Sequence, residues 1–186
     1  ETNVVKVTVI NFVPGSIAAA QTICEGTAPA AFTSVAPTGD GVFTYQWQDS
    51  PDGITFTNII GANAATYSAG VLTSDTYYKR LVTSTLNGTP CTEETNTVLV
   101  TVNNFVPGSI AADQTICEGA TPAALTSVAA TGDGAFTYQW QSSLDGISFV
   151  NITGATLATY APAALTADTW YKRQSTSTLN GNVCTE

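Results

Sequence analysis

The chain contains one sequence that occurs twice, at a constant offset of 93 residues. Residues 11–17 (NFVPGSI) return as residues 104–110, and residues 45–48 (YQWQ) return as residues 138–141, with no insertion or deletion. Repetition at a fixed period predicts an array of similar folded units. Because 93 residues suffice for one small domain, we expect two domains.

The pattern inside one repeat is alternation of apolar and polar residues rather than helical spacing, which indicates strands. Turn signals such as residues 37–41 (PTGDG) and 50–53 (SPDG) separate these runs every 8 to 12 residues or so. The pattern predicts an all-β fold: two tandem antiparallel β-sandwich domains with no significant helix. We expect one strand before the first repeat, at residues 5–9. Within the first repeat we expect strands at residues 16–24, 32–36, 43–48, 54–57, 65–67, 75–85 and 95–102.

The repeat frame is offset from the domain frame by one strand. Residues 1–10 match residues 94–103, so we interpret them as the last strand of a preceding repeat. Residues 11–103 then form the first domain, and residues 104–186 form a second domain that lacks its last strand. Either the polypeptide continues in both directions, which we favour, or separate chains join by strand donation. An unpaired last strand would leave an open sheet edge, which isolated proteins avoid.

The composition argues against several classes of function. The formal net charge is −9, with five Lys and Arg in total, which disfavours binding to nucleic acid or to an anionic membrane surface. The sequence contains no His and no Cys-x-x-Cys pair, so we expect neither catalysis nor a metal site, and no cofactor. No apolar stretch is long enough to predict membrane insertion.

Four cysteines at two repeated positions predict disulfides and an oxidising compartment. Pairing Cys24 with Cys91 and Cys117 with Cys184 would close each domain on itself and stabilise it by about 4 kcal/mol. The alternative joins neighbouring repeats, for example Cys24 with Cys184. In a standard sandwich the two positions of one repeat lie at opposite ends, and Cα atoms more than about 7 Å apart cannot be bridged. The intradomain pairs are our first expectation, and the alternative stays open.

Alternating aromatic residues are expected to form the core rather than a surface on which sugars stack. Trp170, which replaces Tyr77, is a candidate exposed aromatic. The predicted core residues are Phe43, Tyr45, Trp47 and Tyr78 and their copies Phe136, Tyr138, Trp140 and Tyr171.

Four of the five basic residues occur as two adjacent pairs on a predicted strand, Lys79 with Arg80 and Lys172 with Arg173. In an acidic array, these side chains are candidates for ion pairs with the next repeat; the alternative is a solvated strand face. The acidic residues at turns and strand starts, Asp40, Asp52, Asp75 and Glu25, are expected to serve turn chemistry rather than to bind calcium.

The residues of one period together resemble a known group of repeats. The motifs are residues 22–26 (TICEG), 45–48 (YQWQ), 59–62 (IIGA), 66–67 (TY) and 77–80 (YYKR). They resemble the tandem immunoglobulin-like repeats of very large secreted surface proteins of Bacteroidota, including gliding-type adhesins. The resemblance implies an extracellular or cell-surface location, a β-sandwich and a stalk or adhesin role.

The sequence departs from antibody-like domains at the inter-sheet disulfide. Arg80 occupies the position two residues after Tyr78, where the second cysteine would stand, and Cys24 precedes the second strand. We therefore expect a structural repeat unit of a filament or stalk, with copies of itself as partners end to end. The alternative is an adhesive module whose loops bind a glycan or a surface ligand.

Overall fold

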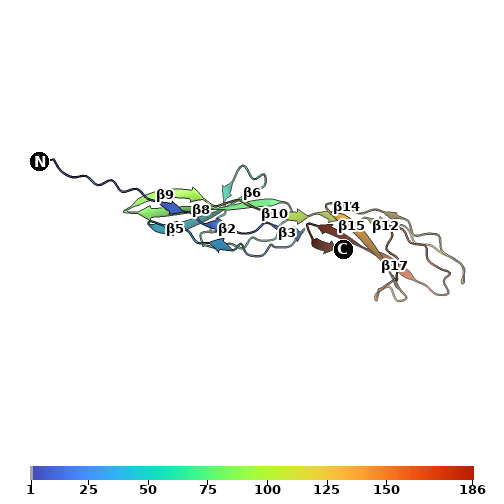
Figure 1. The fold of residues 1–186 in the computed structure, drawn as a ribbon. Coiled ribbons are helices and arrows are strands. Elements are labelled where there is room, and N and C mark those ends of the chain that lie inside the picture. The colour runs from blue at the N-terminus through green and yellow to red at the C-terminus, as the bar shows by residue number, and fades with distance from the viewer. Residues whose placement is uncertain (1) are drawn as a thin grey trace. The chain divides into compact units, whose positions relative to one another are not determined.

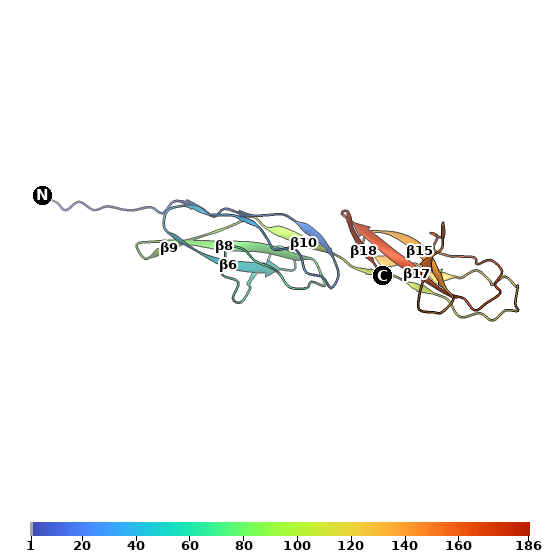
Figure 2. The same ribbon diagram turned by 90° about the horizontal axis from the view of Figure 1, so that it is seen from below.

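The computed structural model describes residues 2–186 as two compact units, Glu1–Val102 and Asn103–Glu186. Each unit is an immunoglobulin-like antiparallel β-sandwich, and no helix occurs in the described range. The all-β prediction of two tandem domains is confirmed. Figure 1 labels the strands, and Figure 2 shows the long strands of each unit from a second direction.

The main sheet of unit 1 is built around the longest strand, β8, which pairs with β6 over nine residues from Val42↔Thr85 to Ser50↔Tyr77. The strand order is β3-β10-β8-β6-β7. Strand β9 pairs with the second half of β8, on the same edge of β8 as β10. The bounds are β3 (Gln21–Cys24), β6 (Val42–Ser50), β7 (Thr57–Asn58), β8 (Thr76–Leu86), β9 (Thr89–Glu94) and β10 (Val98–Asn103).

The opposing layer of unit 1 consists of short pairings. They join β1 (Phe12–Val13) to β5 (Thr38–Gly39) and β2 (Ser16–Ile17) to β4 (Ser34–Val35). Gly15 has a φ of +73°, and an added Cβ would lie 2.2 Å from the Val35 carbonyl oxygen. The turn between β1 and β2 therefore requires glycine.

Unit 2 repeats this plan with fewer paired strands. Its main sheet has the order β16-β15-β17-β18, and no equivalent of β3 or β10 is paired in the part of unit 2 that the structure describes. In unit 1, β3 pairs only with β10. Without an equivalent of β10, the equivalent of β3 in unit 2 therefore has no partner strand. The strands are β11 (Phe105–Val106), β12 (Ser109–Ile110), β13 (Ser127–Val128), β14 (Thr131–Gly132), β15 (Ala135–Ser143), β16 (Val150–Asn151), β17 (Trp170–Leu179) and β18 (Asn182–Thr185).

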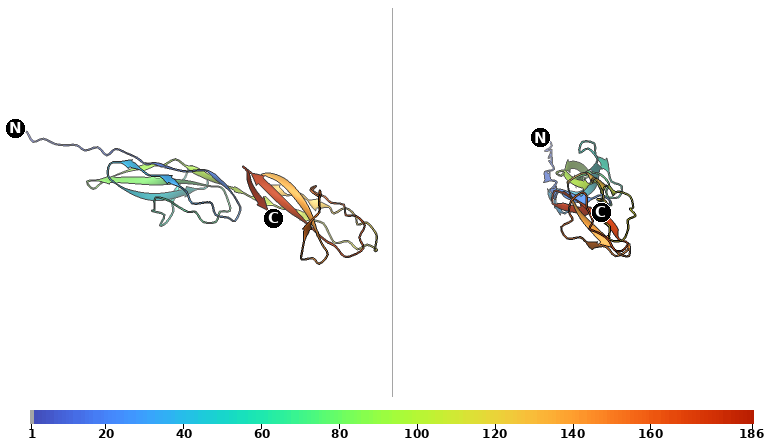
Figure 3. Two further views of the ribbon diagram at one scale, coloured as in Figure 1. Left: turned by 60° about the horizontal axis from the view of Figure 1, so that its bottom comes forward. Right: turned by 90° about the vertical axis from the view of Figure 1, so that its right-hand side faces the viewer.

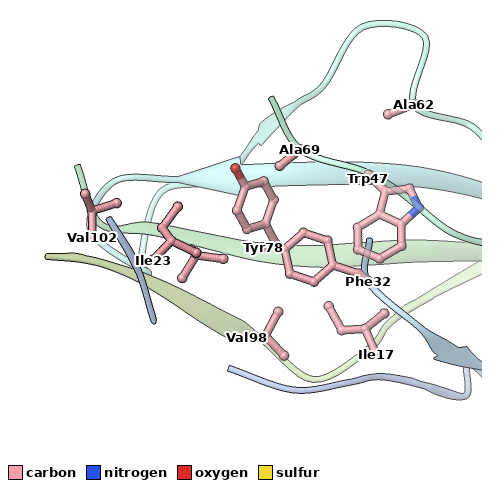
Figure 4. Packing of buried hydrophobic residues seen from close by; sticks show 10 residues of the cluster. Ile17, Ile23, Phe32, Trp47, Ala62, Ala69, Tyr78, Val98 and Val102 are labelled. Carbon is pink, nitrogen blue, oxygen red and sulfur yellow. The ribbon is translucent and has the colours of Figure 1, made fainter. Parts of the chain in front are cut away.

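The core of unit 1 centres on Phe32, which lies between Trp47 and Tyr78 (Figure 4). The Phe32 ring centroid lies 4.8 Å from that of Tyr78 and 5.7 Å from that of Trp47. Trp47 and Trp140 are fully buried, as predicted. The remaining predicted core residues of the two units are less uniform: Tyr78 is buried, whereas Phe43, Tyr45, Phe136, Tyr138 and Tyr171 are half-buried.

Several strand predictions need correction. The strand predicted at 65–67 does not form, and Tyr67 makes only an isolated bridge to Phe32. The strands predicted at 32–36 and 54–57 are reduced to β4 and to β7, which begins at Thr57. The strand predicted at 16–24 is divided into β2 and β3 by the exposed residues 18–20. Residues 5–9, predicted as a strand, have no strand assignment and extend away from the sandwich of unit 1 (Figure 3). The alternating sequence is present in residues 5–9, but a strand also needs a partner for its backbone groups.

Candidate functional site

The cysteines differ in state, although they occupy two equivalent positions. Cys24 and Cys184 are disulfide-bonded, whereas Cys91 and Cys117 carry free thiols. The predicted pairs Cys24–Cys91 and Cys117–Cys184 are therefore wrong.

The geometry of unit 1 explains why its own cysteines do not pair. Cys91 lies opposite Ser84 near one end of β8, whereas Cys24 belongs to the segment that contacts Leu72, beyond the other end of β8. The nine residues from Thr76 to Ser84 span roughly 26 Å at the usual strand rise. A disulfide cannot bridge such a distance.

Unit 2 has the same arrangement. Cys184 lies opposite Ser177 in β17, whereas the loop that follows Cys117 donates the Gly119 amide to the Leu165 carbonyl, ahead of β17. The two cysteine positions thus lie at opposite ends of the long strand in both units.

Arg80 serves the interior of unit 1, not a neighbouring repeat. Its side chain is fully buried, and its guanidinium donates hydrogen bonds to the carbonyl oxygens of Ala65, Pro14 and Val35. The guanidinium carbon lies 4.7 Å from the centre of the Tyr45 ring, a cation–π contact. Burial lowers the pKa of Arg80 from its ordinary value.

Arg173 makes the equivalent contacts in unit 2. It donates to the carbonyl oxygens of Ala158 at 3.0 Å, Pro107 at 2.9 Å and Val128 at 3.0 Å, and it lies over the Tyr138 ring. The side-chain hydrogen bonds of both arginines thus lie within their own units. Each one joins three chain segments of its own unit to the long strand.

The two lysines also make contacts inside their own units. Lys79 Nζ lies 2.7 Å from Glu94 Oε1 and 4.3 Å from the centre of the Phe56 ring. Lys172 lies over the Phe149 ring at 4.5 Å and is exposed. Lys79 thus forms an ion pair with Glu94 on the adjacent strand of its own unit.

The acidic turn residues act as hydrogen-bond acceptors. Asp52 Oδ1 accepts from the backbone amides of Ile54 and Thr55 and from the Ser50 hydroxyl, and these bonds lower the Asp52 pKa to about 2. Asp145 has the equivalent bonds and also a lowered pKa. Within residues 2–186, no group of three or more metal-ligating side chains is suited to hold a metal ion.

Unit 2 has an open groove beside β12, lined by residues 107–110, Lys172, Arg173 and Glu186. In unit 1 the chain that leads into β10 covers the equivalent position. The Ile17 amide donates to Asn96 Oδ1 at 2.9 Å, and Asn96 Nδ2 donates to the Ile17 carbonyl at 2.8 Å.

Sequence reasoning did not identify the Asn96 contact or the arginine–carbonyl contacts. A signal exists for the first, because Asn3 and Asn96 both stand just ahead of a run of alternating valines. The arginine contacts leave no local signal, since their carbonyl partners lie on three separate chain segments.

The fold and these contacts define a tandem array of two immunoglobulin-like sandwich domains whose charged side chains hold each domain together. No helix of the described residues is long and apolar enough to cross a membrane. The chain belongs to the family described as a domain of unknown function, DUF8696, whose model matches residues 13–104 and 106–186. No curated protein matches the chain.

Proposed function

We propose that the chain is a structural repeat unit of an extracellular filament or adhesin stalk at the bacterial cell surface, where it acts as spacer and scaffold. The observation that carries the proposal is that both units preserve the same internal framework. Trp47 Nε1 donates to the Ala64 carbonyl and Trp140 Nε1 donates to the Leu157 carbonyl, both at 2.9 Å. The arginine–carbonyl contacts and the Ser–Asp turns repeat in the same way.

What repeats is therefore the set of contacts that holds each sandwich rigid, as a spacer built from units in series requires. The disulfide supports an oxidising location, because disulfides persist in secreted and surface proteins. The net charge of −9 favours solubility of a long array and disfavours association with anionic surfaces.

The pairing of β10 supports a load-bearing role for unit 1. This strand lies between β3 and β8, so tension on the chain after Asn103 loads backbone hydrogen bonds on both of its edges. Its side chains Val98, Val100 and Val102 are buried in the core, so the strand cannot leave without opening it.

Electron microscopy of the native assembly tests this proposal. Antibodies raised against the folded chain should label filaments at the cell surface along their length. Labelling confined to compact, non-filamentous particles or to the cell interior would contradict it. Pre-immune antibodies provide the control.

An adhesive module is the second candidate, and the exposure of Trp170 favours it. This side chain is 46% exposed and packs against Gly146, whose added Cβ would lie 3.4 Å from the indole ring. A glycan array probed with the chain and with Trp170→Ala tests this candidate. Saturable binding that Trp170→Ala removes would favour adhesion, whereas equal signals from both proteins would exclude Trp170 as the binding residue.

A further inference from the structure

The turn between β8 and β9 places an asparagine directly before a glycine at an exposed hairpin tip (Figure 1). Asn87 and Gly88 are the two residues between the paired strands, and their φ angles are +51° and +81°. Two positive φ angles are typical of the type I′ turn, for which Asn–Gly is a favoured sequence. Unit 2 contains the same turn at Asn180 and Gly181, with φ angles of +49° and +80°.

The chemistry of Asn–Gly makes this turn reactive as well as favourable. Asparagine is a thermolabile residue, because the backbone nitrogen of the next residue can attack its side-chain amide. Glycine hinders this attack least, since it has no Cβ. An added Cβ at Gly88 would meet no atom within 4 Å, so the space beside its backbone is open. Within residues 2–186, no hydrogen bond engages the Gly88 amide or the Asn87 side chain.

The Asp–Gly turns of unit 1 lack this combination. The Gly53 amide donates to Ser50 Oγ at 3.0 Å, so the nitrogen that would attack is engaged. Hydrogen bonds lower the pKa of Asp52 to about 2, and the resulting carboxylate is a far poorer target for a nitrogen than an amide is. The Asp40 carboxylate accepts the Asn11 amide at 3.1 Å. The turn at Asn87 has neither form of protection.

The other asparagines of unit 1 also differ from Asn87. Asn96 uses both its side-chain oxygen and its side-chain nitrogen in hydrogen bonds to the backbone of Ile17. Asn58 Oδ1 accepts from Gln48, and the next residue, Ile59, carries a branched side chain that hinders attack. Among the asparagines of unit 1, Asn87 alone precedes a glycine.

We propose that Asn87 is a site of spontaneous covalent modification, at which the side-chain amide is lost through a succinimide. The Gly88 nitrogen gives up its proton and attacks Asn87 Cγ. A new C–N bond forms, and the Cγ–Nδ2 bond breaks as ammonia leaves with that proton. Water then opens the succinimide ring at either carbonyl. One opening gives aspartate, and the other gives isoaspartate, in which the backbone runs through the former side chain.

The modification changes the hairpin in two ways. Both products replace a neutral amide by a carboxylate, which adds a negative charge to an already acidic chain. Isoaspartate also lengthens the backbone of the turn by one atom. A two-residue turn cannot accommodate this atom and keep its geometry, so the pairs Leu86↔Thr89 and Thr85↔Pro90 should be lost first. The end of β9 then separates from β8.

Peptide mass spectrometry of the intact folded chain, incubated at neutral and at mildly alkaline pH, tests the site. We expect Asn87 to gain the mass difference between an amide and a carboxyl group before any other asparagine of unit 1. The rate should rise with hydroxide concentration, because the Gly88 nitrogen must lose its proton, and hydroxylamine should trap the succinimide. Conversion of Asn87 that is no faster than that of Asn58, or that needs denaturant, would overturn the proposal.

Two glycine variants separate the chemistry from backbone strain. Gly88→Ala puts a Cβ beside the attacking nitrogen and should slow the conversion of Asn87 by roughly 10-fold or more. Gly61→Ala is the matched control, because Gly61 also has a positive φ and open space at the Cβ position but follows Ile60. This control should leave the rate at Asn87 unchanged. Equal slowing by both variants would contradict attack by the Gly88 nitrogen.

The reactivity of Cys91 reports the structural consequence. This residue has a half-buried free thiol and lies in β9 opposite Ser84. Chains with isoaspartate at residue 87 should be alkylated faster at Cys91 than unmodified chains, because the end of β9 is no longer paired. Cys117 is the internal control, since its thiol is exposed and belongs to unit 2. Equal rates at Cys91 in both forms would contradict the loosening of the hairpin.

Discussion

Arg80 is a charged side chain that unit 1 encloses completely. Its guanidinium satisfies carbonyl groups from three segments far apart in the sequence, so its removal leaves several buried acceptors without donors. An adjacent Lys–Arg pair on a strand ordinarily predicts exposure, because charged residues are seldom buried. The chain segments that supply the carbonyl groups come together only in the folded unit, and the sequence pattern therefore could not predict this site.

Replacement of Arg80 by Met should destabilise unit 1 by about 2–4 kcal/mol, because buried carbonyl groups lose charged donors. Denaturant unfolding of the full chain, followed by amide exchange in β6 and β8, measures the change. Lys79→Met is the neighbouring control and should cost less than about 1 kcal/mol, since its ion pair with Glu94 is partly exposed. Equal effects of the two substitutions would contradict the buried role of Arg80.

Asp52 should make the stability of unit 1 depend on acidic pH. Hydrogen bonds lower its pKa from 3.8 to about 2, so the folded state prefers the ionised carboxylate. The resulting stabilisation is fully present above about pH 4 and is lost as the pH falls toward 2. Unfolding curves between pH 5 and pH 2 should show a shallower decline for Asp52→Asn than for the wild type. Parallel curves would show that the turn does not stabilise the ionised form.

The long strands of each unit follow from their alternation, whereas the short ones do not. The expected strands at 43–48, 75–85 and 95–102 correspond to β6, β8 and β10. Buried residues alternate along β8, although its buried face includes Arg80 and Ser84. Two-residue strands such as β1 and β5 exist only through their mutual pairing across the sandwich. The alternating residues 5–9 show the converse: a suitable pattern forms no strand where no edge lies beside it.

Disruption of β10 should open the core of unit 1. Val100 is fully buried, so Val100→Asp places an unpaired charge in the core and should cost more than about 3 kcal/mol. Thr101→Asp adds the same charge on the alternate face and should cost about 1 kcal/mol or less. Thermal unfolding of both variants makes the comparison. A similar loss in both would mean that β10 is not part of the core.

At the scale of the whole molecule, the distribution of cysteine states gives a direct chemical prediction. Alkylation of the folded chain without reductant should modify Cys91 and Cys117 and leave Cys24 and Cys184 unmodified. Peptide mass spectrometry after digestion reads out the four sites separately. Treatment with reductant under denaturing conditions provides the control in which all four cysteines react. Protection of Cys91 together with Cys24 would restore the intradomain pairing.

The two-domain array could be predicted from the repeat alone, but the pairing of its cysteines could not. Sequence spacing gives equivalent positions for Cys24 and Cys117, but it does not show where the two cysteine positions lie within the folded sandwich. The structure places the two positions of each unit at opposite ends of a long strand, which excludes the first expectation. The sequence predicts that unit 2 lacks its last strand. It could not predict the groove beside β12, which becomes visible only in the folded structure.

Single-molecule stretching of the reduced full chain tests the central claim, that the chain is an array of independently held sandwiches that can bear load. Two discrete unfolding events are predicted, each releasing roughly 300 Å of extended chain. Unit 1 should yield at the higher force, because β10 completes its sheet, and Val100→Asp should remove that difference. Gradual extension without discrete events would contradict the claim.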